Sequence, residues 1–204
     1  MPVGDIQANC YVISVNERAL IVDPGAEGNK IIQYLTTQNL KPEAILMTHG
    51  HFDHIGALEE VQATYDIPVY AHQDEQAYLT KASYNLSWKS GRTPIEIKDL
   101  SAFVFIQQEE TIELLGQSID ILHVPGHSLG SIAFYFKAAG MVLTGDALFK
   151  GSIGRTDMIH GNHDQLITSI TSKLFTLPDE TVVYPGHGLA TMIGDEKKTN
   201  PFFR

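Results

Sequence analysis

Thr48-His49-Gly50-His51-Phe52-Asp53-His54-Ile55-Gly56-Ala57 is the stretch that decides the interpretation of this chain, because it holds three histidines and one aspartate within six positions. In extended backbone, side chains two residues apart point to the same side, so His49 and His51 share one direction and Asp53 continues it. His54 follows where the chain must leave the strand. Imidazole and carboxylate groups at this spacing can serve two neighbouring ions, and zinc, iron and manganese all accept them. The stretch therefore predicts a metal site rather than a polar loop.

The residues around this loop predict a junction between a strand and a helix. An apolar run at 44–47 is typical of a strand that is covered on both faces. Apolar residues then recur at helical spacing from Leu58 to Tyr65. Gly50 and Gly56 stand where the backbone must turn tightly or approach another segment closely.

The composition narrows the class of protein. A chain of 204 residues is long enough to bury a core as one domain, or as two small halves that share it. Its formal net charge of −10 disfavours nucleic acid and anionic membranes as partners. No charged-then-apolar stretch opens the chain and no apolar run approaches the roughly 18 residues of a membrane span, so we expect neither a leader nor membrane association. Cys10, the only cysteine, favours the reducing cytoplasm and is expected to be a buried apolar side chain.

The remaining hydrophobic pattern alternates between strands and helices. Strand-like runs lie at 7–15, 19–22, 44–47, 67–71, 103–106, 111–115, 118–124, 132–136, 141–144 and 181–184. Helical spacing covers 28–39, 55–65, 73–80 and a segment that starts near 162–164. The segment 83–99 is irregular, and it either covers a substrate cleft or packs against a helix. This order predicts an α/β fold with two sheets and helices on their outer faces.

Four further candidate residues each follow a strand-like run, and they are Asp23, His127, Asp146 and His187. In α/β folds, chemistry gathers at the carboxyl ends of the strands. For Asp23 two functions stay open, since this carboxylate either caps a turn or orients a metal-bound histidine.

These motifs, taken together and in this order, resemble the metallo-β-lactamase superfamily. The resemblance runs from Asp23-Pro24-Gly25 to Pro185-Gly186-His187-Gly188. It implies an αββα sandwich, with two mixed sheets between outer helices and a binuclear centre at the sheet edge. It also implies seven ligands: His49, His51 and His127 for the first metal, Asp53, His54 and His187 for the second, and Asp146 for both.

Asp146 and the run 151–157 place the resemblance within one branch of that superfamily. Many zinc β-lactamases carry cysteine at the position of Asp146, whereas glyoxalase II-like hydrolases carry a bridging carboxylate. Gly151-Ser152-Ile153-Gly154-Arg155-Thr156-Asp157 is similar to the short bacterial enzymes of the hydroxyacylglutathione hydrolase type. Longer glyoxalase II enzymes add a C-terminal helical domain, whereas this chain ends soon after His187. We therefore expect a single domain over 1–204 with no C-terminal helical domain.

The activity implied by the resemblance is metal-dependent hydrolysis of a thioester of the hydroxyacylglutathione type. Two divalent ions, zinc before iron or manganese, would supply a hydroxide. Asp53 would also take and return a proton. Arg155 is the candidate for an anionic group of the small-molecule substrate, and a salt bridge with Asp157 is its alternative.

Two other activities compete with the thioester hydrolase. A persulfide dioxygenase relative uses one iron held by two histidines and one aspartate, and it shares the Gly-Arg-Thr-Asp stretch. The sequence Pro185-Gly186-His187-Gly188 speaks against it. A lactonase would use the same hydroxide, but no feature selects it. RNA-processing members are disfavoured by the acidic balance, and the oligomeric state stays open.

Overall fold

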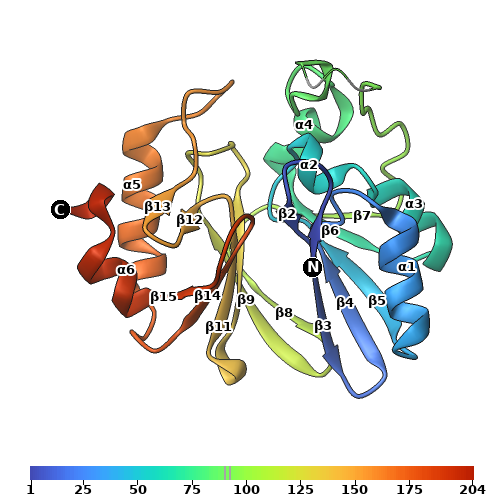
Figure 1. Ribbon diagram of the computed structural model, residues 1–204, viewed down its shortest axis with the longest axis horizontal. Helices are drawn as coiled ribbons and strands as arrows, with labels where there is room; N and C mark the ends of the chain where they lie inside the picture. Colours follow the sequence, from blue (N-terminus) through green and yellow to red (C-terminus); the bar gives the residue numbers. More distant parts are fainter. Residues whose placement is uncertain (90, 92) are drawn as a thin grey trace. The chain divides into compact units, whose positions relative to one another are not determined.

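The computed structural model describes residues 1–89, 91 and 93–204. The chain divides into two compact units, Met1–Ile106 and Gln107–Arg204, which are described separately here (Figure 1). Each unit is built on one mixed sheet, so the predicted α/β class is confirmed. None of the helices in the described ranges has the length and apolar character that a membrane crossing requires.

The described part of unit 1 contains a five-stranded sheet in the order β3-β4-β5-β6-β7. Its strands are β3 (Tyr11–Val15), β4 (Arg18–Val22), β5 (Lys41–Leu46), β6 (Val69–His72) and β7 (Phe103–Ile106). The first two pair as an antiparallel hairpin, and β4 to β7 run parallel. A separate antiparallel pair, β1 (Pro2–Val3) and β2 (Ala8–Asn9), precedes them. Because β4 to β7 are parallel, their carboxyl ends lie at the same end of the sheet, and the histidine-rich loop lies there.

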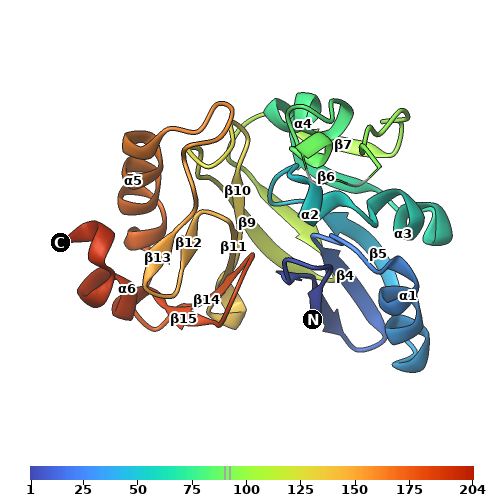
Figure 2. The same cartoon turned by 45° about the horizontal axis from the view of Figure 1, so that its top comes forward.

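The described part of unit 1 contains the helical segments that the apolar spacing predicted, together with shorter ones that it did not predict. They are α1 (Gly28–Thr37), α2 (Phe52–Ile55), α3 (Leu58–Tyr65), η1 (Gln73–Glu75), α4 (Gln76–Thr80) and η2 (Ser87–Lys89). Ile31 of α1 and Val61 of α3 are fully buried and share one core with Ile21 and Ile45 of the sheet. These two helices therefore cover the sheet (Figure 2). The predicted helix 73–80 begins as a 3₁₀ turn. The histidine-rich stretch 48–57, called the metal loop below, contains α2, which was not predicted.

The described part of unit 2 contains a six-stranded sheet in the order β15-β14-β11-β10-β9-β8. The strands are β8 (Thr111–Leu114), β9 (Gln117–His123), β10 (Ile132–Phe136), β11 (Met141–Gly145), β14 (Val182–Pro185) and β15 (Thr191–Met192), with a separate pair β12 (Leu148–Phe149) and β13 (Ser152–Ile153). Only β11 and β14 pair in parallel. The predicted strands of this half are confirmed to within two residues, but β12, β13 and β15 were not predicted.

Two longer helices, α5 (His163–Ser172) and α6 (Ile193–Thr199), cover the sheet of unit 2 (Figure 1). The shorter turns are η3 (Lys137–Ala139), η4 (Leu174–Thr176) and η5 (Pro201–Phe203). Leu166 and Ile170 of α5 and Ile193 of α6 are fully buried in one core with Val142 and Val183. The predicted helix start is confirmed, because the Asn162 side chain accepts a hydrogen bond from the backbone N–H of Gln165.

Candidate metal centre

The predicted ligands fall into two groups, one in each unit. The N-terminal cluster consists of His49, His51, Asp53 and His54, which lie on the loop between β5 and α3. The C-terminal cluster consists of His127, Asp146 and His187, which follow β9, β11 and β14. Each cluster lies beyond the carboxyl ends of strands, as predicted.

The N-terminal cluster is buried and closely spaced. His49, His51 and His54 are each no more than 3% exposed. The ring centre of His49 lies 4.8 Å from that of His51 and 4.2 Å from that of His54. The Oδ2 atom of Asp53 lies 3.5 Å from Nε2 of His54. Burying three imidazoles beside a carboxylate is costly unless their polar atoms bind partners, and a metal ion is the partner that this donor set suits.

Asp23 connects the histidines of this cluster. Its buried carboxylate accepts hydrogen bonds from the backbone N–H of Thr48 at 2.8 Å and from the Thr48 hydroxyl at 2.6 Å. Its Oδ2 atom also lies 3.0 Å from Nδ1 of His54, while the Thr48 hydroxyl lies 3.1 Å from Nδ1 of His49.

This network fixes how the two imidazoles are protonated. A carboxylate only accepts, so Nδ1 of His54 carries the proton. The Thr48 hydroxyl donates to Asp23 and therefore accepts from Nδ1–H of His49. Both rings then present the lone pair of Nε2, which is the form that binds a metal. Sequence reasoning missed Thr48, although it directly precedes His49. The contact that an orienting Asp23 requires is present, and its role in metal binding stays a prediction.

The turn that carries Asp23 is pressed against the metal loop. A Cβ atom at Gly56 would lie 2.4 Å from the carbonyl oxygen of Gly25, closer than any side chain permits. The backbone N–H of Ala57 donates to the carbonyl of Pro24 at 2.9 Å. Gly56 thus provides the close backbone approach that the sequence predicted, and this approach brings Asp23 to the histidines.

The C-terminal cluster is centred on one oxygen atom. Oδ2 of Asp146 lies 3.6 Å from Nε2 of His127 and 3.6 Å from Nε2 of His187. Nδ1 of His127 donates to the backbone carbonyl of Arg155 at 2.9 Å, which leaves Nε2 of that ring as the acceptor. His127 is 3% exposed, whereas the His187 side chain is 27% exposed. This cluster is therefore the more open of the two.

The distances within the C-terminal cluster suit a metal better than a hydrogen bond. A separation of 3.6 Å exceeds hydrogen-bonding range. Two metal–ligand bonds of about 2.1 Å reach at most about 4.2 Å end to end, so one cation can touch both atoms of such a pair. The Asp146 oxygen could therefore bind the same cation as either imidazole. The donors are nitrogen and oxygen, which suits zinc, iron or manganese.

Comparison with known proteins identifies the family of this chain. Residues 3–187 match the metallo-beta-lactamase superfamily. The chain belongs to this superfamily. The probable metallo-hydrolase YqgX of Bacillus subtilis is 48% identical, covering 99% of this chain and 95% of its own. The hydroxyacylglutathione hydrolase GloC of Haemophilus influenzae is 36% identical over the same shares.

Two solved structures of high similarity support the same assignment. The crystal structure of the BLEG-1 B3 metallo-beta-lactamase is 40% identical with a TM-score of 0.94, covering 99% of this chain and 97% of that one. TTHA1623 in a di-iron-bound form is 37% identical with a TM-score of 0.86, covering 99% and 98%. The superfamily fold is therefore established for this chain, and its relatives indicate a metal-dependent hydrolase.

Arg155 meets the C-terminal cluster only through its backbone in the contacts described. Its guanidinium forms two hydrogen bonds of 2.9 Å with the Asp157 carboxylate, and both side chains are about 70% exposed. The bond from Arg155 holds the pKa of the Asp157 carboxyl below its usual value. The salt bridge that sequence reasoning left open is thus present, and substrate binding by Arg155 stays a prediction.

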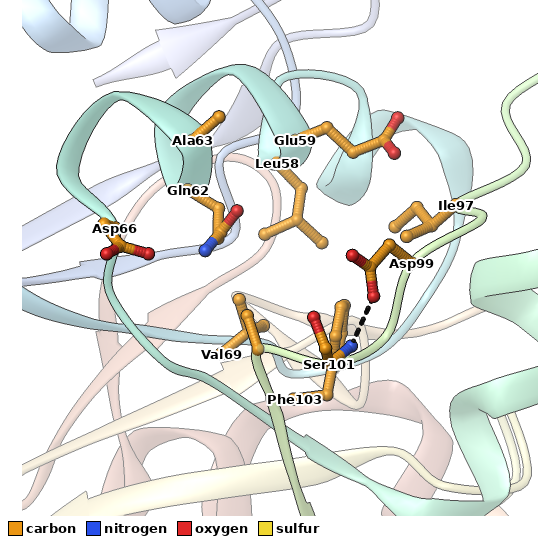
Figure 3. Close-up of a pocket in the computed structure, with 11 residues that line it drawn as sticks. Leu58, Glu59, Gln62, Ala63, Asp66, Val69, Ile97, Asp99, Ser101 and Phe103 are labelled. Atoms are coloured by element: carbon orange, nitrogen blue, oxygen red, sulfur yellow. Dashed lines mark hydrogen bonds between the residues drawn. The ribbon is translucent and has the colours of Figure 1, made fainter.

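Unit 1 has a surface cavity of about 450 Å³ (Figure 3). Its lining includes Leu58 and Glu59 of α3 and the first residues of β6 and β7, Val69 and Phe103. None of the described lining residues belongs to the N-terminal cluster. Val69 and Phe103 begin their strands, whereas the metal loop follows the end of the parallel strand β5.

Proposed function

We propose that the N-terminal and C-terminal clusters contribute to one binuclear metal centre, and that the protein is a hydrolase of thioesters of the hydroxyacylglutathione type. The proposal rests on the ligand set of the superfamily and on one observation, the Oδ2 atom of Asp146, which lies 3.6 Å from the Nε2 atoms of two histidines in the C-terminal cluster. The residues 1–204 would then act as one domain, since each unit alone provides only part of the ligand set.

The assignment of ligands follows the superfamily. His49, His51 and His127 would hold one ion, Asp53, His54 and His187 the other, and Asp146 both. The tautomers that Asp23, Thr48 and the Arg155 carbonyl impose are those that this assignment needs. We assign zinc first, although iron, which TTHA1623 binds, and manganese suit the same donors.

The residues of the chain would divide the chemistry between them. When bound, two divalent ions lower the pKa of a shared water far enough to supply hydroxide near neutral pH. Hydrolysis forms a C–O bond at the thioester carbonyl and breaks the C–S bond. Asp53, which is only 11% exposed, would take the proton of the attacking water and return it to the departing thiolate. Asp146 would fix the arrangement of the ligands from the N-terminal and C-terminal clusters relative to each other.

Two features support a glutathione thioester as the substrate class. GloC, which is named as a hydroxyacylglutathione hydrolase, aligns with nearly the whole chain. Arg155 offers a guanidinium for a carboxylate of such a substrate, in exchange for its exposed partner Asp157.

Cys10 is a buried free thiol, which suits a protein of the reducing cytoplasm.

Hydrolysis of a β-lactam ring is the second candidate. It is favoured by the 40% identity and the TM-score of 0.94 to BLEG-1, which is named as a B3 metallo-beta-lactamase. The same centre would attack a cyclic amide instead of a thioester. The dioxygenase alternative would require one iron instead of two ions.

A substrate panel on the metal-loaded protein tests the proposal. It compares S-lactoylglutathione, an S-acyl thioester without glutathione, a chromogenic cephalosporin, and oxygen uptake with glutathione persulfide. We expect the glutathione thioester to have the highest kcat/KM, and chelation to abolish turnover. A cephalosporin turned over faster than every thioester would support the second candidate, and oxygen uptake with persulfide would overturn both.

A further inference from the structure

Glu75 is a buried carboxylate that the proposed chemistry does not use. It ends η1 and is 1% exposed. Its Oε2 atom accepts a hydrogen bond of 2.6 Å from the backbone N–H of Gly50, 25 residues earlier in the chain. Burial protects this short hydrogen bond from competing water.

The hydrogen bond between Gly50 and Glu75 lies between two predicted metal ligands. Gly50 separates His49 from His51, so its peptide sets the directions of both imidazoles. A Cβ atom at Gly50 would lie 2.7 Å from Cβ of Tyr78 and 3.1 Å from Oε2 of Glu75. The turn between the two histidines therefore lies directly against η1 and α4.

Residues 78–85, which follow Glu75, contact the metal loop at His51 and Phe52. The buried Tyr78 ring lies edge-on to His51, with ring centres 5.6 Å apart. The carbonyl of Asn85 accepts the backbone N–H of Phe52 at 2.9 Å. The fully buried Asn85 side chain is itself fixed by the carbonyls of Tyr78 and Ile95. The first part of the irregular segment 83–99 thus packs against the metal loop.

We propose that Glu75 is a positioning residue, which fixes the His49-Gly50-His51 turn through the Gly50 N–H and aligns both imidazoles for metal binding. This inference rests on the proposed metal centre. Partners that orient metal ligands are worth about 10- to 100-fold in metal affinity. Glu75 differs from Asp23 because it acts on the backbone between two ligands and not on a ligand ring.

Unit 2 offers a matched control. Glu196 is also a buried glutamate, 2% exposed, and its Oε2 atom also accepts a backbone glycine N–H, that of Gly151 at 2.9 Å. Its other hydrogen bonds come from Thr191 and Asn200, which are not predicted ligands. Removing Glu196 should therefore cost stability without a direct effect on metal affinity.

The test compares Glu75→Ala, Glu75→Gln and Glu196→Ala with the wild type. Metal-free protein is titrated with Co²⁺, and affinity is measured by competition with a chelator. We expect Glu75→Ala to weaken the first Co²⁺ site by about 10- to 100-fold and to change its visible spectrum. Glu75→Gln keeps an acceptor oxygen and should restore the spectrum. Glu196→Ala should keep the wild-type affinity and spectrum.

Two results would overturn the inference, and they differ from the failure of the proposed function. If Glu75→Ala binds Co²⁺ like the wild type, or if Glu196→Ala weakens binding equally, Glu75 has no specific positioning role. If wild-type protein binds no Co²⁺, the metal centre itself is wrong. If Glu75→Ala does not fold, Glu75→Asp replaces it, because a side chain one methylene shorter withdraws from Gly50 and should weaken the same site.

Discussion

The N-terminal cluster comes from one loop of six residues, whereas the C-terminal cluster comes from the ends of three strands that are far apart in the sequence. The first cluster is buried and organised by side chains, since Asp23 and Thr48 contact two of its histidines. The second is more open, and its visible orienting contact is a backbone carbonyl, that of Arg155. Substitutions should therefore disturb the orienting contacts of the N-terminal cluster more easily than those of the C-terminal cluster.

The largest effect is expected where the C-terminal cluster depends on one side chain. Asp146→Ala removes the only oxygen placed between His127 and His187 among the described contacts. We expect kcat/KM for the glutathione thioester to fall by at least about 1000-fold, which corresponds to about 4 kcal/mol of transition-state stabilisation. Asp157→Ala is the control, because Asp157 pairs with exposed Arg155. Activity within tenfold of wild type in Asp146→Ala would disprove the shared-oxygen centre.

An intermediate effect is expected from the side-chain network of the N-terminal cluster. Asp23→Asn cannot accept all three hydrogen bonds that the carboxylate accepts, so His54 and His49 lose their enforced tautomers. Zinc affinity should fall by about 10- to 100-fold, measured by chelator competition. Asp120→Asn is a control, since Asp120 also accepts a threonine hydroxyl but lies within β9 and is not a predicted ligand or its partner. An equal loss in both variants would mean that Asp23 acts only through stability.

A smaller effect is expected at Arg155, because the C-terminal cluster uses its backbone and not its side chain. Arg155→Ala keeps the carbonyl that accepts from His127. We expect unchanged metal content and kcat, with KM for the glutathione thioester raised about 3- to 10-fold by the loss of an exposed ionic contact. A thioester without a carboxylate should show no change. Loss of metal in Arg155→Ala would contradict the claim that the C-terminal cluster depends on the backbone carbonyl of Arg155 and not on its side chain.

The smallest effect concerns Cys10, which lies between β2 and β3 of unit 1. Burial raises the pKa of the Cys10 thiol to about 12, and the thiol is fully buried. The neutral thiol is the form favoured at pH 8, so a disulfide reagent should not react with native protein at that pH. The reagent should react only when the protein unfolds, and this reaction is measured by thiol titration at increasing urea concentrations. Rapid labelling of the native protein would show that this part of unit 1 opens locally.

The sequence predicted what depends on local pattern. Apolar runs located the long strands, and helical spacing located α1 and α5. The ligand candidates were recognisable because each follows such a run directly. Strand pairs of two residues and the four-residue α2 are too short to produce a periodic pattern.

The contacts that organise the N-terminal cluster could not be predicted in the same way. Asp23 lies 25 residues from Thr48, and Gly50 lies 25 residues from Glu75. These pairs meet only because parallel strands bring their carboxyl ends to one edge of the sheet. Thr48 and Glu75 look like ordinary polar residues in the sequence, and their burial is known only from the fold.

The most direct test of the account is a titration of metal-free protein with Mn²⁺, followed by electron paramagnetic resonance. A centre shared by both clusters predicts two Mn²⁺ ions per chain with a spin-coupled signal, and Asp146→Ala should abolish the coupling. One ion per chain, or two ions without coupling, would contradict the proposal that the N-terminal and C-terminal clusters form one binuclear centre.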